Sequence, residues 1–327
     1  MDQKLNKNTR SRRKMRKYTE QEEEEIKARY KLSEEKHNQI FEDIKRIWLT
    51  DPIPVEHPQA IIIGGQTGAG KTGMIGYSKN QFEDGNVVII NSDDLKPFHP
   101  QSSEIARLYP ELYTKITDQE SNTWTSDLFE TTMQEGYNLI FEGTMKNTRI
   151  LGSIQKLKSL GYEVTVRGLA VSDLESMLSI LERYNAQVSV KGWGRLVVPN
   201  HHYETYNGMP ETIQAIEEAN VVDHIEILKR GPRPTEPKMI YSERDRMGYS
   251  NAKRAVLKGR EEDTLRILKD FEARARAINE SMVKRKASPE EQQILLDLLA
   301  HFYEVREQCS KKKPEKEPEE GYAIGED

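Results

Sequence analysis

The sequence is poor in the features that mark secreted, membrane-spanning and disulfide-stabilised proteins. Its 327 residues contain one cysteine, Cys309, which excludes an intrachain disulfide framework and is typical of a reducing compartment. No apolar stretch approaches the roughly 18–20 residues needed to cross a bilayer. The N-terminal residues are too polar for the apolar segment of a secretory signal. We therefore expect a cytoplasmic protein that does not use a membrane as a partner.

Signals of nucleic-acid binding are also scarce. Residues 1–17 carry eight Lys or Arg against one Asp, and a glutamate-rich block follows at 20–25. No aromatic stacking platform lies between the basic residues, and no recognisable nucleic-acid module is present. We therefore interpret residues 1–18 as a basic disordered tail. Contact of this tail with nucleic acid or with an acidic partner is the weaker interpretation.

The residues that are present suit a packed core with a highly charged periphery. Apolar residues make up 35% of the chain, charged residues 31%, and the net charge is −5. The length allows one large domain or two smaller ones. No internal repeat is found, so the repeat architectures are not expected.

One stretch carries the strongest chemical signal. An apolar run at 60–63 precedes the pattern G-x-x-x-x-G-K-T of a phosphate-binding loop, formed by Gly65, Gln66, Thr67, Gly68, Ala69, Gly70, Lys71 and Thr72. Glycines let the backbone curl so that its N–H groups and the N-terminus of the next helix can hold a polyphosphate. In this pattern Lys71 reaches the β- and γ-phosphates and the Thr72 hydroxyl binds Mg²⁺. The alternative is a glycine-rich turn without a ligand.

The region around this loop alternates strands and helices. We predict five strands, at 60–63, 86–91, 137–142, 163–171 and 224–228. This alternation predicts an α/β fold, with a parallel sheet that carries helices on both faces. In such sheets ligands bind at the carboxyl ends of the strands.

Capping patterns predict where several helices begin. Residues 19–22 read Thr-Glu-Gln-Glu, a capping box that opens a helix running towards Trp48. Residues 172–175 read Ser-Asp-Leu-Glu, a second capping box. Pro289 follows Ser288 and opens a late helix, because proline is favoured at the first helical position.

Composition shifts divide the chain into four parts. Residues 19–230 form the predicted P-loop kinase-like domain, and a proline-rich linker begins at 231. We predict a helical extension at 231–310, which we interpret as an appendage and not as an active unit. Residues 311–327 are rich in Lys, Pro and Glu, and we expect a disordered tail.

Two adjacent carboxylates, Asp93 and Asp94, follow the predicted strand at 86–91. A small-molecule kinase needs a base beside the phosphate loop to orient and deprotonate the acceptor hydroxyl. We expect this strand to lie next to the loop strand, so that Asp93 faces the γ-phosphate. We expect Asp94 to cap or brace the following turn, which is a common role of aspartate after a strand.

Three further side chains are candidates by position. Glu142 ends the predicted strand at 137–142 and could reach Mg²⁺ through water or hold a substrate hydroxyl; the alternative is a solvated charge. Arg183 lies near a helix end, and Arg195 lies in a glycine-rich loop. Mobile arginines commonly neutralise the charge of a transferring phosphoryl group. A lone arginine, however, is usually solvated or part of a surface ion pair.

These segments together resemble the zeta toxin family. The likeness covers roughly residues 40–230 and rests on the phosphate loop, on Asn-Ser-Asp-Asp at 91–94 with Phe-His-Pro at 98–100, on Glu-Gly-Thr at 142–144, on Leu-Glu-Arg-Tyr at 181–184 and on the loop of Arg195. The resemblance implies a kinase that uses ATP and Mg²⁺ to phosphorylate a sugar hydroxyl of UDP-N-acetylglucosamine. It also implies that a small helical antitoxin could neutralise the protein.

The resemblance also implies individual roles. It makes Asp93 the base, places Lys71, Arg183 and Arg195 on phosphates, and places Glu142 and Thr144 near the substrate. The sequence departs from the family at Ser126, where we expect a glutamate that contacts the sugar, and at Lys146, where we expect arginine. We keep both as candidate substrate contacts. Thr67 stands where the family often has proline. These departures affect the identity of the sugar more than the kinase chemistry.

Two other functions stay open. One is a kinase of another nucleotide or of a nucleic-acid end, and the other is a non-catalytic, nucleotide-dependent switch or assembly module. The sequence has no Asn-Lys-x-Asp motif, which a GTPase switch would use to read its base. For regulation, our hypothesis is that the helix at 19–48, or a separate small helical antitoxin, covers the nucleotide cleft.

Overall fold

A parallel sheet forms the centre of the computed structural model, which describes residues 18–192, 194, 199–233, 236–245 and 248–311. Within these residues the sheet has the strand order β2-β3-β1-β4-β5-β6. Its strands are β1 (Gln59–Gly64), β2 (Val88–Ile90), β3 (Leu139–Glu142), β4 (Glu163–Leu169), β5 (His224–Lys229) and β6 (Lys238–Ser242). The first five strands are parallel, so the predicted fold class is confirmed. Most of the two predicted tails and Arg195 lie outside the described residues.

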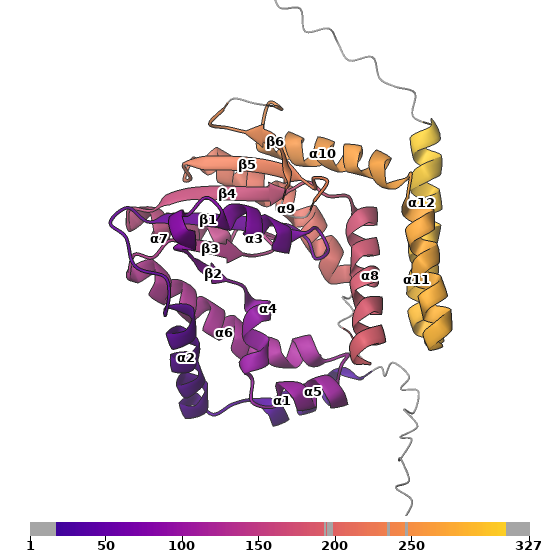
Figure 1. Cartoon of the computed structure of the whole chain (residues 1–327), viewed down its shortest axis with the longest axis horizontal. Helices are drawn as coiled ribbons and strands as arrows, with labels where there is room; N and C mark the ends of the chain where they lie inside the picture. Colours follow the sequence, from indigo (N-terminus) through magenta and orange to yellow (C-terminus); the bar gives the residue numbers. More distant parts are fainter. Residues whose placement is uncertain (1–17, 193, 195–198, 234–235, 246–247, 312–327) are drawn as a thin grey trace, which may run out of the picture.

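Helices surround the sheet (Figure 1). In the described part of the chain they are α1 (Glu20–Tyr30), α2 (Glu34–Trp48), α3 (Lys71–Lys79), α4 (Ser92–Leu95), α5 (Ser102–Leu108), α6 (Tyr113–Gln134), α7 (Ile150–Ser159), α8 (Asp173–Lys191), α9 (Pro199–Ala219), α10 (Ala252–Ile267), α11 (Phe271–Arg285) and α12 (Pro289–Lys311). Two 3₁₀ helices, η1 (Glu83–Gly85) and η2 (Lys96–Phe98), lie beside β2 in the sequence.

The side chains of β1 show that both faces of the sheet are covered. Ala60 and Ile62 belong to a core shared with α6, α7, α9 and α10, whereas Ile61 and Ile63 belong to a second core shared with α3. Successive residues of a strand point to opposite faces, and all four of these side chains are buried. A strand buried on both faces needs apolar residues at every position. This explains the uninterrupted run at 60–63.

The position of β2 differs from the prediction. We expected the 86–91 strand to lie next to the loop strand, but β3 lies between β2 and β1. Leu139 and Ile140 of β3 are fully buried, which suits an interior position, whereas β2 is a short strand at the sheet edge. After β1 the chain forms β2 and β3, which lie on one side of β1 in the strand order. It then forms β4, which pairs with β1 on the other side. Such a switch point is where parallel sheets bind ligands.

The predicted single helix at 19–48 is two helices. The Thr19 side chain accepts a hydrogen bond from Glu22 N–H at 3.2 Å, and the Glu22 carboxylate accepts one from Thr19 N–H at 2.9 Å, as the capping box predicted. The helix then breaks, because Leu32 N–H donates to the Glu120 carboxylate of α6 at 3.1 Å and Ser33 caps α2. A tertiary hydrogen bond to α6 therefore interrupts a sequence that is helical on both sides.

The segment after residue 230 contributes a strand that the sequence analysis did not predict. β6 pairs antiparallel with β5, and its Tyr241 and Ser242 are buried. The residues that we interpreted as a linker therefore connect two strands of one sheet. A single short edge strand that follows a proline-rich stretch gives little periodic signal.

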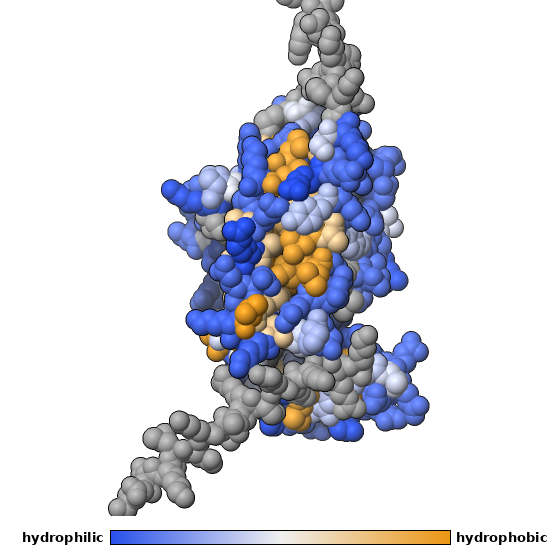
Figure 2. Space-filling model, turned by 90° about the vertical axis from the view of Figure 1, so that its right-hand side faces the viewer, coloured by the Kyte–Doolittle hydropathy of each residue, from blue (hydrophilic) through white to orange (hydrophobic). Residues whose placement is uncertain are grey.

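The C-terminal helices pack on α8. Phe271 of α11 stacks on Phe302 of α12, with ring centroids 4.3 Å apart, in an apolar cluster that includes Leu178 and Leu181 of α8. Figure 2 looks onto this side of the molecule and shows apolar side chains gathered among polar ones. Among the described residues, no helix is long and apolar enough to span a membrane.

Candidate active site

The loop after β1 has the backbone of a phosphate-binding turn. Gly68 and Gly70 adopt φ values of 83° and 100°, a region that side chains other than glycine rarely occupy. A Cβ atom on Gly68 would also lie 2.2 Å from the carbonyl oxygen of Ser176 in α8. The loop is therefore packed directly against α8 at a point that only glycine fits.

Two side chains of the loop, Gln66 and Lys71, hold its backbone in place through hydrogen bonds. Gln66 is fully buried and donates hydrogen bonds to the Val171 carbonyl at 2.8 Å and to the Ser176 hydroxyl at 3.3 Å. The Lys71 ammonium donates to the Gly65 carbonyl at 2.9 Å and lies 3.6 Å from Glu142. Burial lowers the pKa of Lys71, an effect that the carboxylates of Glu142 and Asp93 oppose.

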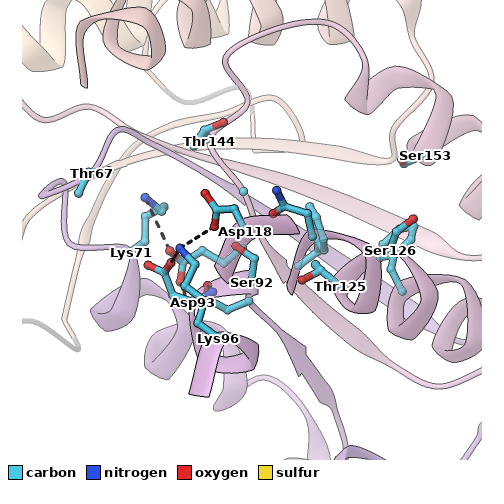
Figure 3. A pocket seen from close by; sticks show the side chains of 16 residues that line it. Thr67, Lys71, Ser92, Asp93, Lys96, Asp118, Thr125, Ser126, Thr144 and Ser153 are labelled. Carbon is cyan, nitrogen blue, oxygen red and sulfur yellow. Dashed lines mark hydrogen bonds and ion pairs between the residues drawn. The ribbon is translucent and has the colours of Figure 1, made fainter. Parts of the chain in front are cut away.

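A polar cavity of about 460 Å³ opens beside the loop (Figure 3). It is lined by Thr67, Lys71, Asn91, Ser92, Asp93, Lys96, Asp118, Asn122, Thr125, Ser126, Phe129, Phe141, Glu142, Gly143, Thr144 and Ser153. In Figure 3, Lys71 lies towards one end of the cavity, and Ser126 and Ser153 lie towards the other. The loop, the ends of β2 and β3, and helix α6 therefore meet at one site. Its size suits a small-molecule ligand.

Asp93 lines this cavity from the short helix α4. Its Oδ1 atom lies 2.7 Å from the ammonium of Lys96, and Lys96 lies 2.8 Å from Asp118 of α6. The Lys96 side chain is only 4% exposed, so a buried cation holds two carboxylates in place. Asp94 is not among the cavity-lining residues. Burial and the neighbouring charge of Asp93 raise the pKa of Asp94.

Lys96 and Asp118 are site residues that the sequence analysis missed. Lys96 follows a predicted strand end as one polar residue among several. Asp118 lies in a long helix without a motif around it. The one signal for Lys96 was its spacing of three residues from Asp93, which places both on one side of a helical turn.

Glu142 ends β3 inside the cavity. Its carboxylate accepts a hydrogen bond from the Asn91 side chain at 2.9 Å and faces Lys71. Burial raises the pKa of Glu142, while the ammonium of Lys71 opposes this shift. Asn91 also accepts from Asp93 N–H at 2.9 Å, so one amide connects the ends of β2 and β3.

The other predicted residues are distributed as follows. Thr144 and Ser126 line the cavity, whereas the ammonium of Lys146 lies 3.2 Å from Glu204 and is not among the lining residues. Arg183 on α8 is close enough for its charge to act on Lys71. Thr72 is the second residue of α3 and is exposed. None of the cavity-lining residues comes from 19–48, so these helices do not cover the described cavity.

The donors at this site fit a magnesium ion held together with a nucleotide. No group of three or more His, Cys, Asp or Glu that could hold a metal occurs in the described residues. Mg²⁺ does not need such a group, since it keeps several waters and binds through one or two protein oxygens plus substrate phosphates. Glu142, which faces Lys71 in the cavity, has oxygens of this kind, and the Thr72 hydroxyl lies in the first turn of α3 outside the lining residues.

A curled glycine loop between a buried parallel strand and a helix, opening on a polar cavity, defines a P-loop kinase-like protein. The sequence model of the zeta toxin family matches residues 16–245, and the chain belongs to this family. The chain is 28% identical to toxin zeta of Streptococcus agalactiae over 180 residues, which cover 54% of this chain and 62% of that protein. It is 30% identical to toxin PezT of Streptococcus pneumoniae serotype 4 over 177 residues, which cover 54% of this chain and 70% of that protein.

A solved structure from the PezAT chromosomal toxin–antitoxin system of Streptococcus pneumoniae has the same fold. It superposes with a TM-score of 0.65 at 24% sequence identity, covering 77% of this chain and 99% of that chain. The chain spans less than two thirds of the length of the toxin zeta sequences that it matches. Most of the segment after β6 lies outside the family match.

Proposed function

We propose that this protein is an ATP- and Mg²⁺-dependent kinase that phosphorylates a sugar hydroxyl of a nucleotide sugar, with UDP-N-acetylglucosamine as the first candidate. The observation that carries this proposal is the meeting of Lys71, Asp93 and Glu142 in one polar cavity. A phosphate-binding cation, a base and a second carboxylate are the parts that phosphoryl transfer to a hydroxyl requires. The single cysteine suits a reducing compartment, and we place the reaction in the cytoplasm.

Each residue has a distinct part in the proposed reaction. The loop N–H groups and Lys71 would hold the β- and γ-phosphates, and Thr72 would hold Mg²⁺, which would supply positive charge opposite the phosphates. Asp93 accepts the proton of the acceptor hydroxyl. At the same time the hydroxyl oxygen forms a bond to the γ-phosphorus, and the bond between the γ-phosphorus and the bridging oxygen of the β-phosphate breaks. Arg183, and Arg195 outside the described residues, neutralise charge on the transferring group. Glu142 and Thr144 position the substrate.

The far end of the cavity supports a sugar as the acceptor. Ser126 and Ser153 lie there and supply hydroxyl groups (Figure 3), and the cavity lining also includes the hydroxyl of Thr125 and the amide of Asn122. Neutral donors and acceptors of this kind match the hydroxyls of a sugar. A glutamate expected at Ser126 is missing, so the sugar could differ from N-acetylglucosamine.

Mass spectrometry of a metabolite mixture incubated with ATP and Mg²⁺ tests the proposal. We expect a nucleotide sugar whose mass increases by one phosphoryl group, and no such product with Lys71→Ala. A product on a free nucleotide or on a nucleic-acid end would favour the alternative kinase. ATP binding without any product would favour a nucleotide-dependent switch, and an active Lys71→Ala protein would overturn the kinase assignment.

We also propose a small helical antitoxin as a partner in trans. The support is the likeness to a structure from a toxin–antitoxin system. In addition, helices α1 and α2 do not line the cavity. The hypothesis that these helices inhibit their own protein in cis by covering the site therefore lacks support. Deleting residues 1–38 should leave turnover unchanged if inhibition requires a partner; a rise in turnover would restore the cis version.

A further inference from the structure

The phosphate-binding loop is held from outside by an arginine that lies after the last parallel strand. The guanidinium of Arg230 donates hydrogen bonds to the carbonyl oxygens of Gly68 and Ala69, the second at 3.2 Å. The loop N–H groups must point inward to bind phosphate, so these carbonyls point outward and need donors. Arg230 supplies donors to two of them at once.

Arg230 is itself held by a buried carboxylate. Its Nη1 atom donates to Glu175 of α8, whose side chain is only 1% exposed. Arg266 of α10 and Arg274 of α11 donate to the same carboxylate, at 2.6 and 2.9 Å. Three guanidinium groups from three parts of the chain therefore converge on Glu175. Burial acts to raise the pKa of Glu175, but Arg274, Arg230 and Arg266 hold it below its usual range.

This arrangement corrects the predicted capping box at 172–175. Ser172 caps α8 by accepting from Glu175 N–H at 3.2 Å, as predicted. The Glu175 carboxylate, however, is bound to the three arginines and does not complete the box. Asp263 of α10 takes that place and accepts from Ser172 N–H at 2.8 Å. The start of α8, which backs the loop at Ser176, is thus tied to the C-terminal helices.

We propose that Arg230 is a positioning residue for the phosphate-binding loop and that α10 and α11 keep it in place through Glu175. The C-terminal helices α10, α11 and α12, which lie outside the family match, then act on nucleotide affinity and are more than an appendage. A loop without this support populates its binding conformation for a smaller fraction of the time. Its apparent affinity for nucleotide falls by that fraction, while the chemistry of the bound state is retained.

This inference builds on the proposed function, and direct ATP binding tests it without any acceptor. We expect Arg230→Gln to raise the dissociation constant and the KM for ATP about tenfold, within the usual range of coupling between sites, with kcat changed less than about twofold. Arg230→Lys, which keeps the charge but loses the paired donors, should lie between Arg230→Gln and the wild type.

The contribution of the C-terminal helices needs a separate variant and a matched control. Arg274→Gln removes one guanidinium from Glu175 and should weaken ATP binding in the same direction, although Arg274 does not contact the loop. Arg306→Gln on α12 removes an exposed ion pair with Glu272 and should leave ATP affinity unchanged. Thermal melting of each variant establishes that binding is measured on folded protein.

The outcomes separate the inference from the proposed function. A wild-type protein that does not bind ATP would overturn both. A wild-type protein that binds ATP, together with an Arg230→Gln variant of equal affinity, would overturn the inference and leave the kinase proposal standing. A loss of kcat at unchanged ATP affinity would also overturn it, because a positioning residue of the loop acts on nucleotide binding. Equal losses of ATP affinity in Arg274→Gln and Arg306→Gln would show that α11 does not act on the loop through Glu175.

Discussion

Asp93 and Asp94 are neighbours in the sequence but have different surroundings. Asp93 lines the cavity and is oriented by Lys96, whereas Asp94 is not a lining residue. We predict that Asp93→Asn binds ATP nearly as well as the wild type but transfers phosphoryl about 10²–10⁴-fold more slowly, the usual loss of a positioned base. Asp94→Asn should stay active. ATP affinity and single-turnover transfer of both variants check this, and a dead Asp94→Asn protein would mean that the base is misassigned.

Lys96 offers a second prediction at the residue scale. Its ammonium pairs with Oδ1 of Asp93 and with Asp118, so it orients the Asp93 carboxylate. Lys96→Met should lower kcat roughly 10²-fold, because small displacements of a reacting group have effects of this size. ATP affinity should change little. The two carboxylates are 44% and 36% exposed, so water can solvate them in the variant.

Steady-state kinetics with an identified acceptor measure the effect of Lys96→Met. Lys156→Met is the matched control, since Lys156 pairs with Glu130 on the surface and is not a cavity-lining residue. Equal kcat values for Lys96→Met and the wild type would show that Asp93 needs no orienting cation.

The residues of the site differ in how far the sequence could predict them. Lys71 and Asp93 follow strands and Glu142 ends one, and the rule that ligands bind at strand ends leads to them directly. Lys96 and Arg230 act through contacts with residues far along the chain, Asp118 and Glu175. No local pattern marks such pairs, so only the folded structure brings them to notice.

At the scale of elements, the loop depends on its packing against α8. Gly68→Ala places a Cβ atom 2.2 Å from the Ser176 carbonyl and in an unfavourable φ region, so the loop must shift. We predict loss of measurable ATP binding together with reduced thermal stability. Gly152→Ala is the control: in the described part of the chain nothing lies within 4 Å of its Cβ position in α7, and alanine should stabilise this helix by roughly 0.5–1 kcal/mol. Normal ATP binding by Gly68→Ala would contradict the role given to α8.

The strands were predicted where short apolar runs stand between turn residues. The predicted strands at 60–63, 86–91, 137–142, 163–171 and 224–228 overlap β1, β2, β3, β4 and β5. The break between α1 and α2 depends on a hydrogen bond to α6, and the position of β3 between β2 and β1 depends on sheet pairing. Both depend on contacts between residues that are distant in the sequence, and local helix or strand propensity does not predict such contacts.

At the scale of the whole molecule, α8 connects the nucleotide site to the C-terminal helices. At its start, Asp173 accepts a hydrogen bond from His301 of α12 at 2.7 Å. Towards its end, the hydroxyl of Tyr184 donates to Glu291, which also pairs with Arg285 at 3.0 Å. The docking of α12 on α8 therefore involves the charged pair His301–Asp173 at one contact and the Glu291 carboxylate at the other, and pH should change it.

His301 makes this dependence specific. The hydrogen bond to Asp173 raises the pKa of His301 above its ordinary value of 6.5, with smaller help from the charges of Asp173 and Glu304. The pKa of Asp173 lies below its usual range: burial acts to raise it, but the hydrogen bond and charge of His301, together with the hydrogen bond from Leu174 N–H and the charge of His202, lower it. Because the folded-state pKa of His301 is raised, its stabilisation is complete below pH 6.5 and is lost as pH rises through the folded-state value.

We therefore predict that His301→Gln is less stable than the wild type at pH 5.5 and equally stable well above the folded-state pKa of His301. The imidazole is 34% exposed, so solvent screening limits the difference to about 0.2–1 kcal/mol. The stability difference between His301→Gln and the wild type is measured from urea unfolding midpoints, followed by circular dichroism across this pH range. His57→Gln, at an exposed position before β1, is the control and should show no such trend. A difference between His301→Gln and the wild type that is constant with pH would mean that His301 contributes by packing and not by charge.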